Sequence, residues 1–333
     1  MNWKTGYTAA YYMTTVDPVT WRDLERIEIT RGSINRVTEG LRESASVGCT
    51  NYGEMIEQWV RIWLEAKQEG SSARVPLFTG LATTPADNYS GQSKDNELQL
   101  YSVLKTADDV ALLRGWYAPA GMSGAAVIKD LLSILPSPVL IADNAPALTN
   151  HIIAEDNETR LSMTEKILVA IDWRMKITGD GTVHIEPKPE EPSITFDPLE
   201  NDVLETEITV QADLFSCPNV LLAIDNDLSA IARDDSENSP LSTINRGREV
   251  WAVETACDLA DDETIEQYAT RRLKEKQKIR KTAIYTRRFM PDIYPNDQIR
   301  LHYPAQDLDG VYTVKSQSIS LEYSANTNEE ITE

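Results

Sequence analysis

Cysteine and histidine are both scarce in this sequence, with 3 of each among 333 residues. The cysteines form no CxxC pair and their number is odd, which argues against a disulfide framework and against a zinc cluster. Buried free thiols are the simpler interpretation. The histidines have no HExxH or HxH spacing, so no histidine-based metal site is predicted, and we expect no cofactor. These residues are Cys49, Cys217 and Cys257, and His151, His184 and His302.

Motifs for nucleotide binding and covalent catalysis are also missing. The chain contains neither GxxxxGK[ST] nor GxGxxG, so no phosphate-binding loop is predicted. The segment AGMSGAA around Ser123 does not follow a strand directly, so it does not predict a nucleophile elbow. The pairs Asp234/Asp235 and Asp156/Glu158 could be imagined as glycosidase acids. With 53 acidic residues in the chain, however, solvated surface charge is the simpler interpretation, and no enzymatic activity is expected.

Long apolar runs are absent as well. The longest apolar stretches, such as AAVIKDLLSIL, contain charges and are far shorter than the ~20 residues that cross a bilayer. No basic segment followed by an apolar run begins the chain, so no signal peptide is predicted. We therefore expect a protein without a membrane anchor that is made and folded in a cytoplasm.

The charge that is present is strongly acidic, with a formal net charge of −21. A surface of this sign repels phosphates, which disfavours generic DNA binding. One basic cluster interrupts it. The cluster is either a docking face for an acidic partner or neighbouring copy, or a solvated helix face with bases at its C-terminal end. Its members are Arg271, Arg272, Lys274, Lys276, Lys278, Arg280, Lys281, Arg287 and Arg288.

The first hundred residues favour β structure. In RIEITRGSINR the apolar phase continues past Gly32 only if the strand bulges there. QWVRIWLEA carries bulky residues in both phases, so both of its faces should be covered. VPLFTGLATTP and ELQLYSVLK follow, with ADNYSGQSKDN predicted as a loop between them. This pattern predicts a meander of about five strands.

From about residue 105 the apolar spacing becomes helical. SGAAVIKDLLSILPSP predicts a helix that stops at Pro136, and NETRLSMTEKILVAIDWR predicts a second helix capped by Asn157 or Thr159. MKITGDGTVHIEP then predicts a hairpin with a type I′ turn at Asp180-Gly181. The proline-rich, acidic segment EPKPEEPSITFDP predicts a boundary near residue 190.

The remaining segments predict strands and one helix. VLETEITVQAD alternates, with Leu204, Thr206, Ile208 and Val210 expected to face inward, and EVWAVETACDL predicts another strand. DDETIEQYATRRLKEKQKIRK predicts a helix, 262–281, which should begin at Asp261 or Asp262.

The end of the chain predicts two strands with a bulge. QIRLHY alternates regularly. In the strand after it, Tyr312 and Val314 share one phase and Ile319 and Leu321 share the other. This change of phase predicts a bulge within Lys315–Ser318, as in strands that bend around a barrel.

This order of elements and the closing pattern P-x-I-x-x-x-D-x-I-x-L…G-x-Y-x-V-x-S-x-S-x-x-L resemble the tail hub proteins of bacteriophages. The family often has Gly before the Asp, where this chain has Asn296. The matching residues are Pro291, Ile293, Asp297, Ile299, Leu301, Gly310, Tyr312, Val314, Ser316, Ser318 and Leu321.

The resemblance implies an α+β, mainly β fold with two barrel-like modules similar to the tail tube protein. The expected parts are a β-barrel-like module in 1–105, an α-rich insert with a hairpin in 106–190, and a second barrel-like module in 191–333. It further implies a homotrimer that forms a pseudo-sixfold ring in the virion, at the tail tip or baseplate. Implied partners are the tail tube or distal tail protein, the tape measure protein and a tail fibre or spike protein, with DNA only as passing cargo.

Two other interpretations remain open. Within structural proteins, the chain could be a distal tail or receptor-binding adaptor, which a hexameric mass would distinguish from a trimeric hub. In another class, it could be a carbohydrate-binding or carbohydrate-active β protein with Trp63, Trp116 and Tyr117 stacking on sugars, although buried aromatics are the simpler reading.

Overall fold

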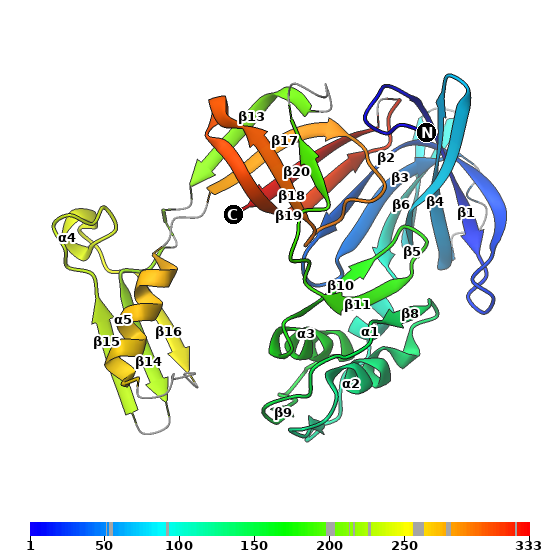
Figure 1. The fold of residues 1–333 in the computed structure, drawn as a ribbon. Helices are drawn as coiled ribbons and strands as arrows, with labels where there is room; N and C mark the ends of the chain where they lie inside the picture. Colours follow the sequence, from blue (N-terminus) through cyan, green and yellow to red (C-terminus); the bar gives the residue numbers. More distant parts are fainter. Residues whose placement is uncertain are drawn as a thin grey trace. The chain divides into compact units, whose positions relative to one another are not determined.

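The computed structural model has an α+β, mainly β fold, as the sequence predicted (Figure 1). It describes residues 1–50, 52, 56–90, 93–197, 204–212, 214–215, 217–225, 228–255, 263–277, 281–323 and 325–333. The chain divides into two compact units. The first contains Met1–Ile208 and Ile284–Ile331, and the second contains Thr209–Ala283 and Thr332–Glu333. Residues 209–283 thus form a compact unit within the segment 191–333, where the second barrel-like module is expected.

The strands of the N-terminal region close into a barrel in the first unit. They pair in the order β1-β4-β5-β6-β3-β2, and β1 also pairs antiparallel with β2, which completes the ring. Closure leaves no free edge around the ring. These strands are β1 (Thr8–Val16), β2 (Asp23–Val37), β3 (Glu43–Cys49), β4 (Gln58–Gln68), β5 (Ser71–Ser90) and β6 (Ser93–Ser102).

Strand β4 shows why the barrel is well packed. Val60, Ile62 and Leu64 are fully buried in one phase, and Arg61 is buried in the other. Both faces are therefore covered at this point, as the bulky residues in both phases predicted. The bulge predicted at Gly32 is also present nearby, since the register of β2 against β3 shifts between Ile29 and Arg31.

The prediction of a loop in ADNYSGQSKDN is wrong over most of the segment. β5 and β6 continue as a paired ladder, with Asp87 opposite Asn96 and Ser90 opposite Ser93; residues 91–92 lie outside the described part. The Asn96 side chain donates to Asp87 and accepts from the backbone N–H of Tyr52. Polar side chains here form cross-strand bonds, which a reading based on composition does not reveal.

Residues 105–187, where an α-rich insert with a hairpin is expected, form short helices and strands, and we call this segment the insert. Its elements share one apolar core. Thr159, rather than Asn157, caps α3 in a capping box with Ser162. The elements are α1 (Lys105–Asp108), β7 (Tyr117–Ala118), α2 (Gly124–Leu131), the 3₁₀ turn η1 (Leu132–Ile134), β8 (Val139–Ile141), β9 (Ile152–Ile153), α3 (Arg160–Ala170), β10 (Trp173–Ile177) and β11 (Val183–Pro187).

The predicted hairpin is formed by β10 and β11, but its turn is not type I′. Thr178 and Thr182 close the turn with a backbone bond of 3.0 Å, and of the residues between them Gly181 alone has a positive φ, of 83°. A type I′ turn needs two consecutive residues with positive φ, and Asp180 has a negative one. The turn is therefore one residue longer than predicted.

This turn ties the insert to the barrel. The Thr79 hydroxyl donates to the Gly179 carbonyl at 2.8 Å, and Arg61 and Trp21 both donate to the Asp180 carbonyl, at 3.1 and 2.9 Å. The approach is so close at Gly179 that a Cβ there would lie 1.9 Å from a backbone oxygen of β5. Only glycine fits this contact.

The other strands of the first sheet extend it beyond the barrel. The order continues β2-β19-β20-β17-β13, with β18 pairing to β19 and β12 to β18, in one 12-stranded sheet. The inward alternation predicted for β13 is wrong at Val210, which is 41% exposed. The strands are β12 (Ile194–Phe196), β13 (Leu204–Ala212), β17 (Lys281–Arg288), β18 (Gln298–Tyr303), β19 (Leu308–Ser320) and β20 (Asn326–Thr332), with the 3₁₀ turn η2 (Pro304–Gln306).

Strand β19 joins the two parts of this sheet. Through Thr313 it pairs with β18, and from Ser316 it pairs with β2 of the barrel. Its buried side chains change phase between Val314 and Gln317, within the predicted bulge region. The phase change lies where the strand passes from one antiparallel partner, β18, to the other, β2.

The second unit is a three-stranded sheet with one helix against it (Figure 1). β14 (Val220–Asp225) lies between β15 (Leu228–Arg233) and β16 (Trp251–Thr255), and α5 (Ile265–Lys276) packs on one face. A short helix, α4 (Thr243–Arg246), lies between β15 and β16 in sequence. Helix α5 is shorter than the predicted 262–281 and begins after Thr264, which forms a capping box; the predicted caps, Asp261 and Asp262, lie outside the described residues.

Candidate functional site

The residues considered as catalytic candidates lie in different elements of the structure. Ser123 occupies the N-cap position of α2. The Asp234 carboxylate accepts from Ser239 and Gln277 within the second unit, and Glu158 pairs with Lys166. In the described part of the chain, no three metal-ligating side chains cluster. None of the described helices combines the length and apolar character of a membrane span.

The aromatic residues considered for sugar stacking belong to different parts of the first unit. Trp63 lies on β4, and the Arg74 guanidinium covers its ring at 3.9 Å. Trp116 packs against the core of the insert. Tyr117 is 59% exposed on β7. Since one ring is covered and another is packed, these residues do not form a shared stacking platform.

The basic cluster is divided between the two compact units. Arg287 was predicted to belong to the docking face, but it is 1% exposed and cannot reach a partner. Arg271, Arg272, Lys274 and Lys276 lie on α5, Lys281 begins β17 in the second unit, Arg287 and Arg288 end β17 in the first unit, and Lys278 and Arg280 lie outside the described residues.

Three of the four bases of α5, Arg271, Arg272 and Lys276, form ion pairs within their own unit. Arg271 forms ion pairs with Glu263 at 2.8 Å and with Glu275 at 3.4 Å. Arg272 binds Glu254 at 2.8 Å and Glu275 at 2.6 Å. Hydrogen bonds from Arg272, Lys276 and Tyr268 lower the pKa of Glu254 to about 2. Most of the basic groups on this side of the unit are therefore paired rather than free.

The opposite face of the same sheet is apolar and exposed. Ile231 and Val253 lie across from Leu222 on either side of it, and they are 57% and 59% exposed. Trp251 is 48% exposed beside them, and Ile224 continues the row on β14. We call these five residues the apolar sheet face. The charged group nearest in register, Arg233, is paired with Glu249 at 2.7 Å.

A sequence signal for this face exists but is weak. In LSAIAR the small residues Ala230 and Ala232 are the buried ones, and they pack in the core under α5. The larger Ile231 points the other way. Small residues alternating with large apolar ones can indicate a strand whose helix-covered side is tightly packed and whose other side is open, but the sequence alone does not say which side is covered.

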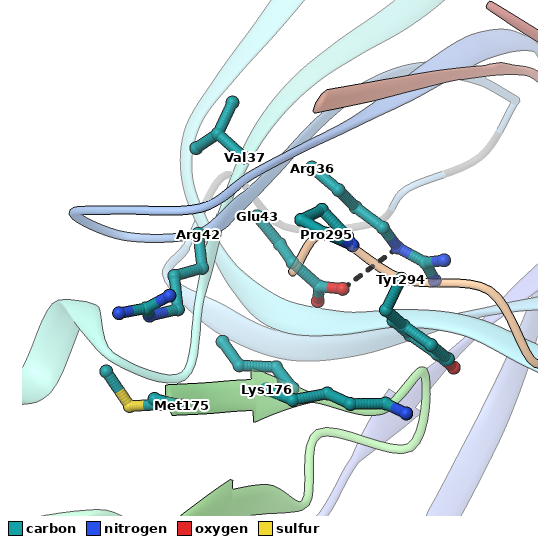
Figure 2. A pocket seen from close by; sticks show the side chains of 9 residues that line it. Arg36, Val37, Arg42, Glu43, Met175, Lys176, Tyr294 and Pro295 are labelled. Atoms are coloured by element: carbon teal, nitrogen blue, oxygen red, sulfur yellow. Dashed lines mark ion pairs between the residues drawn. The ribbon is translucent and has the colours of Figure 1, made fainter. Parts of the chain in front are cut away.

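The first unit contains a second feature that the sequence did not indicate, an ion pair buried where the barrel, the insert and the segment before β18 meet. Figure 2 shows Arg36 and Glu43 pointing toward each other beside Tyr294. Their closest nitrogen and oxygen are 3.0 Å apart, and their side chains are 1% and 3% exposed. The cavity beside them has a volume of about 10 Å³.

Tyr294 is held between two cations at this junction. The Arg36 guanidinium and the Lys176 ammonium each lie 4.5 Å from the centre of its ring. Arg174, also on β10, binds Asp297 at 2.7 Å and the Asn296 carbonyl at 2.7 Å. The turn that contains Tyr294 and Asp297 is thereby fixed to both the barrel and the insert.

Comparison with solved structures assigns the fold. The chain is similar to a tail protein from Neisseria meningitidis MC58, with 15% identity, a TM-score of 0.66, and coverage of 99% of this chain and 97% of that chain. The 43 kDa tail protein of prophage MuSo2 from Shewanella oneidensis matches with 11% identity, a TM-score of 0.64, and coverage of 97% and 98%. A Francisella PdpA–VgrG complex matches with 9% identity and a TM-score of 0.56, over 98% of this chain and 58% of that chain.

No protein-family model matches the chain, and no curated protein matches its sequence. The two tail proteins match over almost the whole of both chains, so the likeness includes the barrel, the insert, the extended sheet and the second unit. At these low identities what is shared is the fold. The resemblance inferred from the closing sequence pattern is therefore confirmed at the level of structure: this chain has the fold of these tail proteins.

Proposed function

We propose that this chain is a structural tail protein, a baseplate hub that closes the distal end of a phage tail tube as a homotrimeric ring and forms part of the DNA conduit. The observation that supports this most is that one chain contains both a closed barrel and a second set of strands, joined through β19. The whole-chain likeness to prophage tail proteins supports the same assignment.

The ring follows from symmetry. If each chain supplies two tube-like modules, three chains supply six, and a threefold ring can then match a sixfold tube. Cyclic symmetry closes such an assembly without leaving unused interfaces. The proposed partners are the tail tube or distal tail protein, the tape measure protein and a fibre or spike protein. The proposed location is the tail tip of the virion, after assembly in the host cytoplasm.

The acidic charge suits a conduit for DNA. A net charge of −21 per chain gives phosphates few places to bind along a bore. We expect the potential along the bore of an assembled ring to be negative or neutral. Mapping that potential on an experimental structure of the ring tests the idea, and a strongly positive bore would contradict it.

Native mass spectrometry of the purified chain, alone and with the tube protein, tests the assembly directly. We expect a species with three times the 37.3 kDa mass of the chain, and a complex of that species with the tube protein. A hexamer would instead support a distal tail adaptor. A chain that stays monomeric under both conditions would contradict the hub assignment.

We further propose that the apolar sheet face contacts a neighbouring copy in this ring. Two chains that each carry −21 repel one another, so they approach most easily through surfaces without net charge. The face meets that condition, because all five of its residues are uncharged. It is also rich in large apolar groups, which are typical of the buried centre of an interface.

An Ile231→Asp variant is expected to weaken the trimer, because the new carboxylate would be buried without a partner in the contact. We expect the concentration for half-assembly to rise by about tenfold or more, which for a trimer is about a hundredfold change in the dissociation constant and corresponds to ~2.8 kcal/mol per trimer. Sedimentation velocity over a concentration series measures the concentration for half-assembly. Val19→Asp, at a position that is 89% exposed, is the matched control and should assemble normally. A trimer unaffected by Ile231→Asp would remove the face from the interface without contradicting the hub.

A further inference from the structure

The first unit buries two arginine–glutamate pairs that differ in how their carboxylates are satisfied. Glu329 on β20 accepts from Tyr285, from Arg287 through two nitrogens and from Gln317, at 2.6–3.1 Å. These bonds and the nearby guanidinium favour the ionised form, so the pKa of Glu329 is lowered in spite of complete burial.

Glu43 is in the opposite situation. Its partner Arg36 is close, but among the described residues no group makes a well-aligned hydrogen bond to either Glu43 oxygen. The cavity of about 10 Å³ has room for one water molecule at most, so an ionised carboxylate stays poorly solvated there. Burial raises the pKa of Glu43 to about 7, and Arg36 opposes this only in part.

The other charged groups around Glu43 do not supply the missing bonds. Arg42 lies on the same hairpin, but its guanidinium binds Glu165 at 2.7 Å. Lys176 on β10 lies within 4.0 Å of Asp297 and over the Tyr294 ring. Asp180 in the β10–β11 turn is negative and adds to the cost of a charge on Glu43. Tyr294 also faces the pair, and burial raises its pKa, so its hydroxyl stays neutral.

We propose that the Arg36–Glu43 pair is a proton-operated latch: a proton on Glu43 keeps the Tyr294–Asp297 turn closed against the barrel, and its release draws water into the cavity and loosens that turn. When Glu43 is neutral, Arg36 still donates through Nη2 to the Leu77 carbonyl at 2.6 Å and lies over the Tyr294 ring, while its Nε and Nη1 atoms have no hydrogen-bond partner among the described residues. The arginine therefore keeps this hydrogen bond and this ring contact in the closed state. When Glu43 is charged, the carboxylate needs more hydrogen bonds than the closed cavity can provide.

The direction of the pH effect follows from linkage. A carboxyl whose pKa is raised to about 7 binds its proton more tightly in the folded than in the unfolded protein. The stabilisation from this site is therefore complete below the ordinary pKa of 4.5 and is lost as the pH rises through about 7. The latch is closed at mildly acidic pH and loosened at mildly alkaline pH. This holds whether or not the protein is a hub.

Hydrogen exchange of the turn measures the latch. The reporters are the amide of Asp297, bonded to the Tyr294 carbonyl at 3.1 Å, and the amide of Asn296, bonded to the Val314 carbonyl at 2.8 Å. After correction for intrinsic exchange rates, we expect their protection in the full chain to fall by roughly tenfold or more between pH ~5.5 and ~8.5. A change of this size follows when the pKa of Glu43 differs by about one unit or more between the closed and the loosened turn.

Two variants make the test specific. Glu43→Gln is neutral at every pH, so it should remove the pH dependence. Glu186→Gln is the control: it alters the carboxylate on β11 that pairs with Arg174 on β10, and it should leave the pH dependence unchanged. Unchanged protection of the native chain across this pH range, or pH dependence retained in Glu43→Gln, would overturn the proposal.

A measurement on the native chain covers the case in which Glu43→Gln does not fold. Carbon-13 NMR of labelled glutamate side chains should show one carboxyl that titrates near neutral pH, well separated from the exposed acids. If every glutamate titrates in the ordinary acidic range, the latch does not exist.

Discussion

Replacing Glu329 with alanine is expected to lower the free energy of unfolding by about 3–5 kcal/mol, the range found when one partner of a buried ion pair is removed. Arg287 and Glu329 are 0% exposed at their side chains and 2.6 Å apart. Without the carboxylate, the Arg287 charge and the Tyr285 hydroxyl would both remain buried with a lost partner. Urea unfolding followed by circular dichroism measures the change.

The neighbouring acid provides the control. Glu330 forms an ion pair with Lys315 at 2.8 Å, in which the two side chains are 28% and 54% exposed. Glu330→Ala should cost less than about 1 kcal/mol, because water screens such a pair. A double change of Arg287→Met and Glu329→Leu should recover much of the loss, since apolar groups can replace a buried pair. Similar losses for Glu329→Ala and Glu330→Ala would contradict the expectation.

Gly179→Ala is expected to separate the tip of the insert hairpin from the barrel. The added Cβ would lie 1.9 Å from the Pro76 oxygen and 2.5 Å from its carbonyl carbon. These are backbone atoms, which cannot move aside as a flexible side chain can, so the turn itself must shift. It would then lose its bonds to Thr79, Arg61 and Trp21. We expect the free energy of unfolding to fall by about 3 kcal/mol or more, which is at the upper end of the range for overpacked substitutions.

The emission of Trp21 reports this separation, because its indole N–H donates to the Asp180 carbonyl at 2.9 Å. A red shift and faster proteolysis of the insert should accompany the loss of stability. Gly6→Ala is the matched control, since a Cβ there meets no atom within 4 Å and its cost should stay within about 0.5 kcal/mol. A Gly179→Ala protein as stable as Gly6→Ala would contradict the close contact.

The features that were predicted correctly depend on short stretches of sequence. The cap at Thr159, the covered faces of β4 and the phase change in β19 are all visible in the spacing of a few residues. The incorrect predictions depend on neighbours. The β5–β6 segment was expected to be a loop because of its composition, but cross-strand bonds extend the ladder, and the β10–β11 turn has the geometry that its contact with β5 requires.

The dependence on distant neighbours is even clearer for the candidate site. A run of bases was visible in the sequence, but whether those bases are free depends on Glu254 and Glu263, which the fold places beside α5. The buried pairs are equally hidden from sequence. Arg287 and Glu329 are 42 positions apart, and nothing in the local pattern distinguishes them from surface charges.

The sequence by itself determined the mainly β character, the positions of most strands and helices, and the pattern that pointed to a tail protein fold, because periodicity and capping act between residues a few positions apart. The tertiary structure alone decided which charges are neutralised, which sheet face is left open and that Glu43 is buried with an incomplete set of hydrogen bonds. Those properties depend on which distant segments meet, and burial changes the cost of a charge far more than any local pattern does.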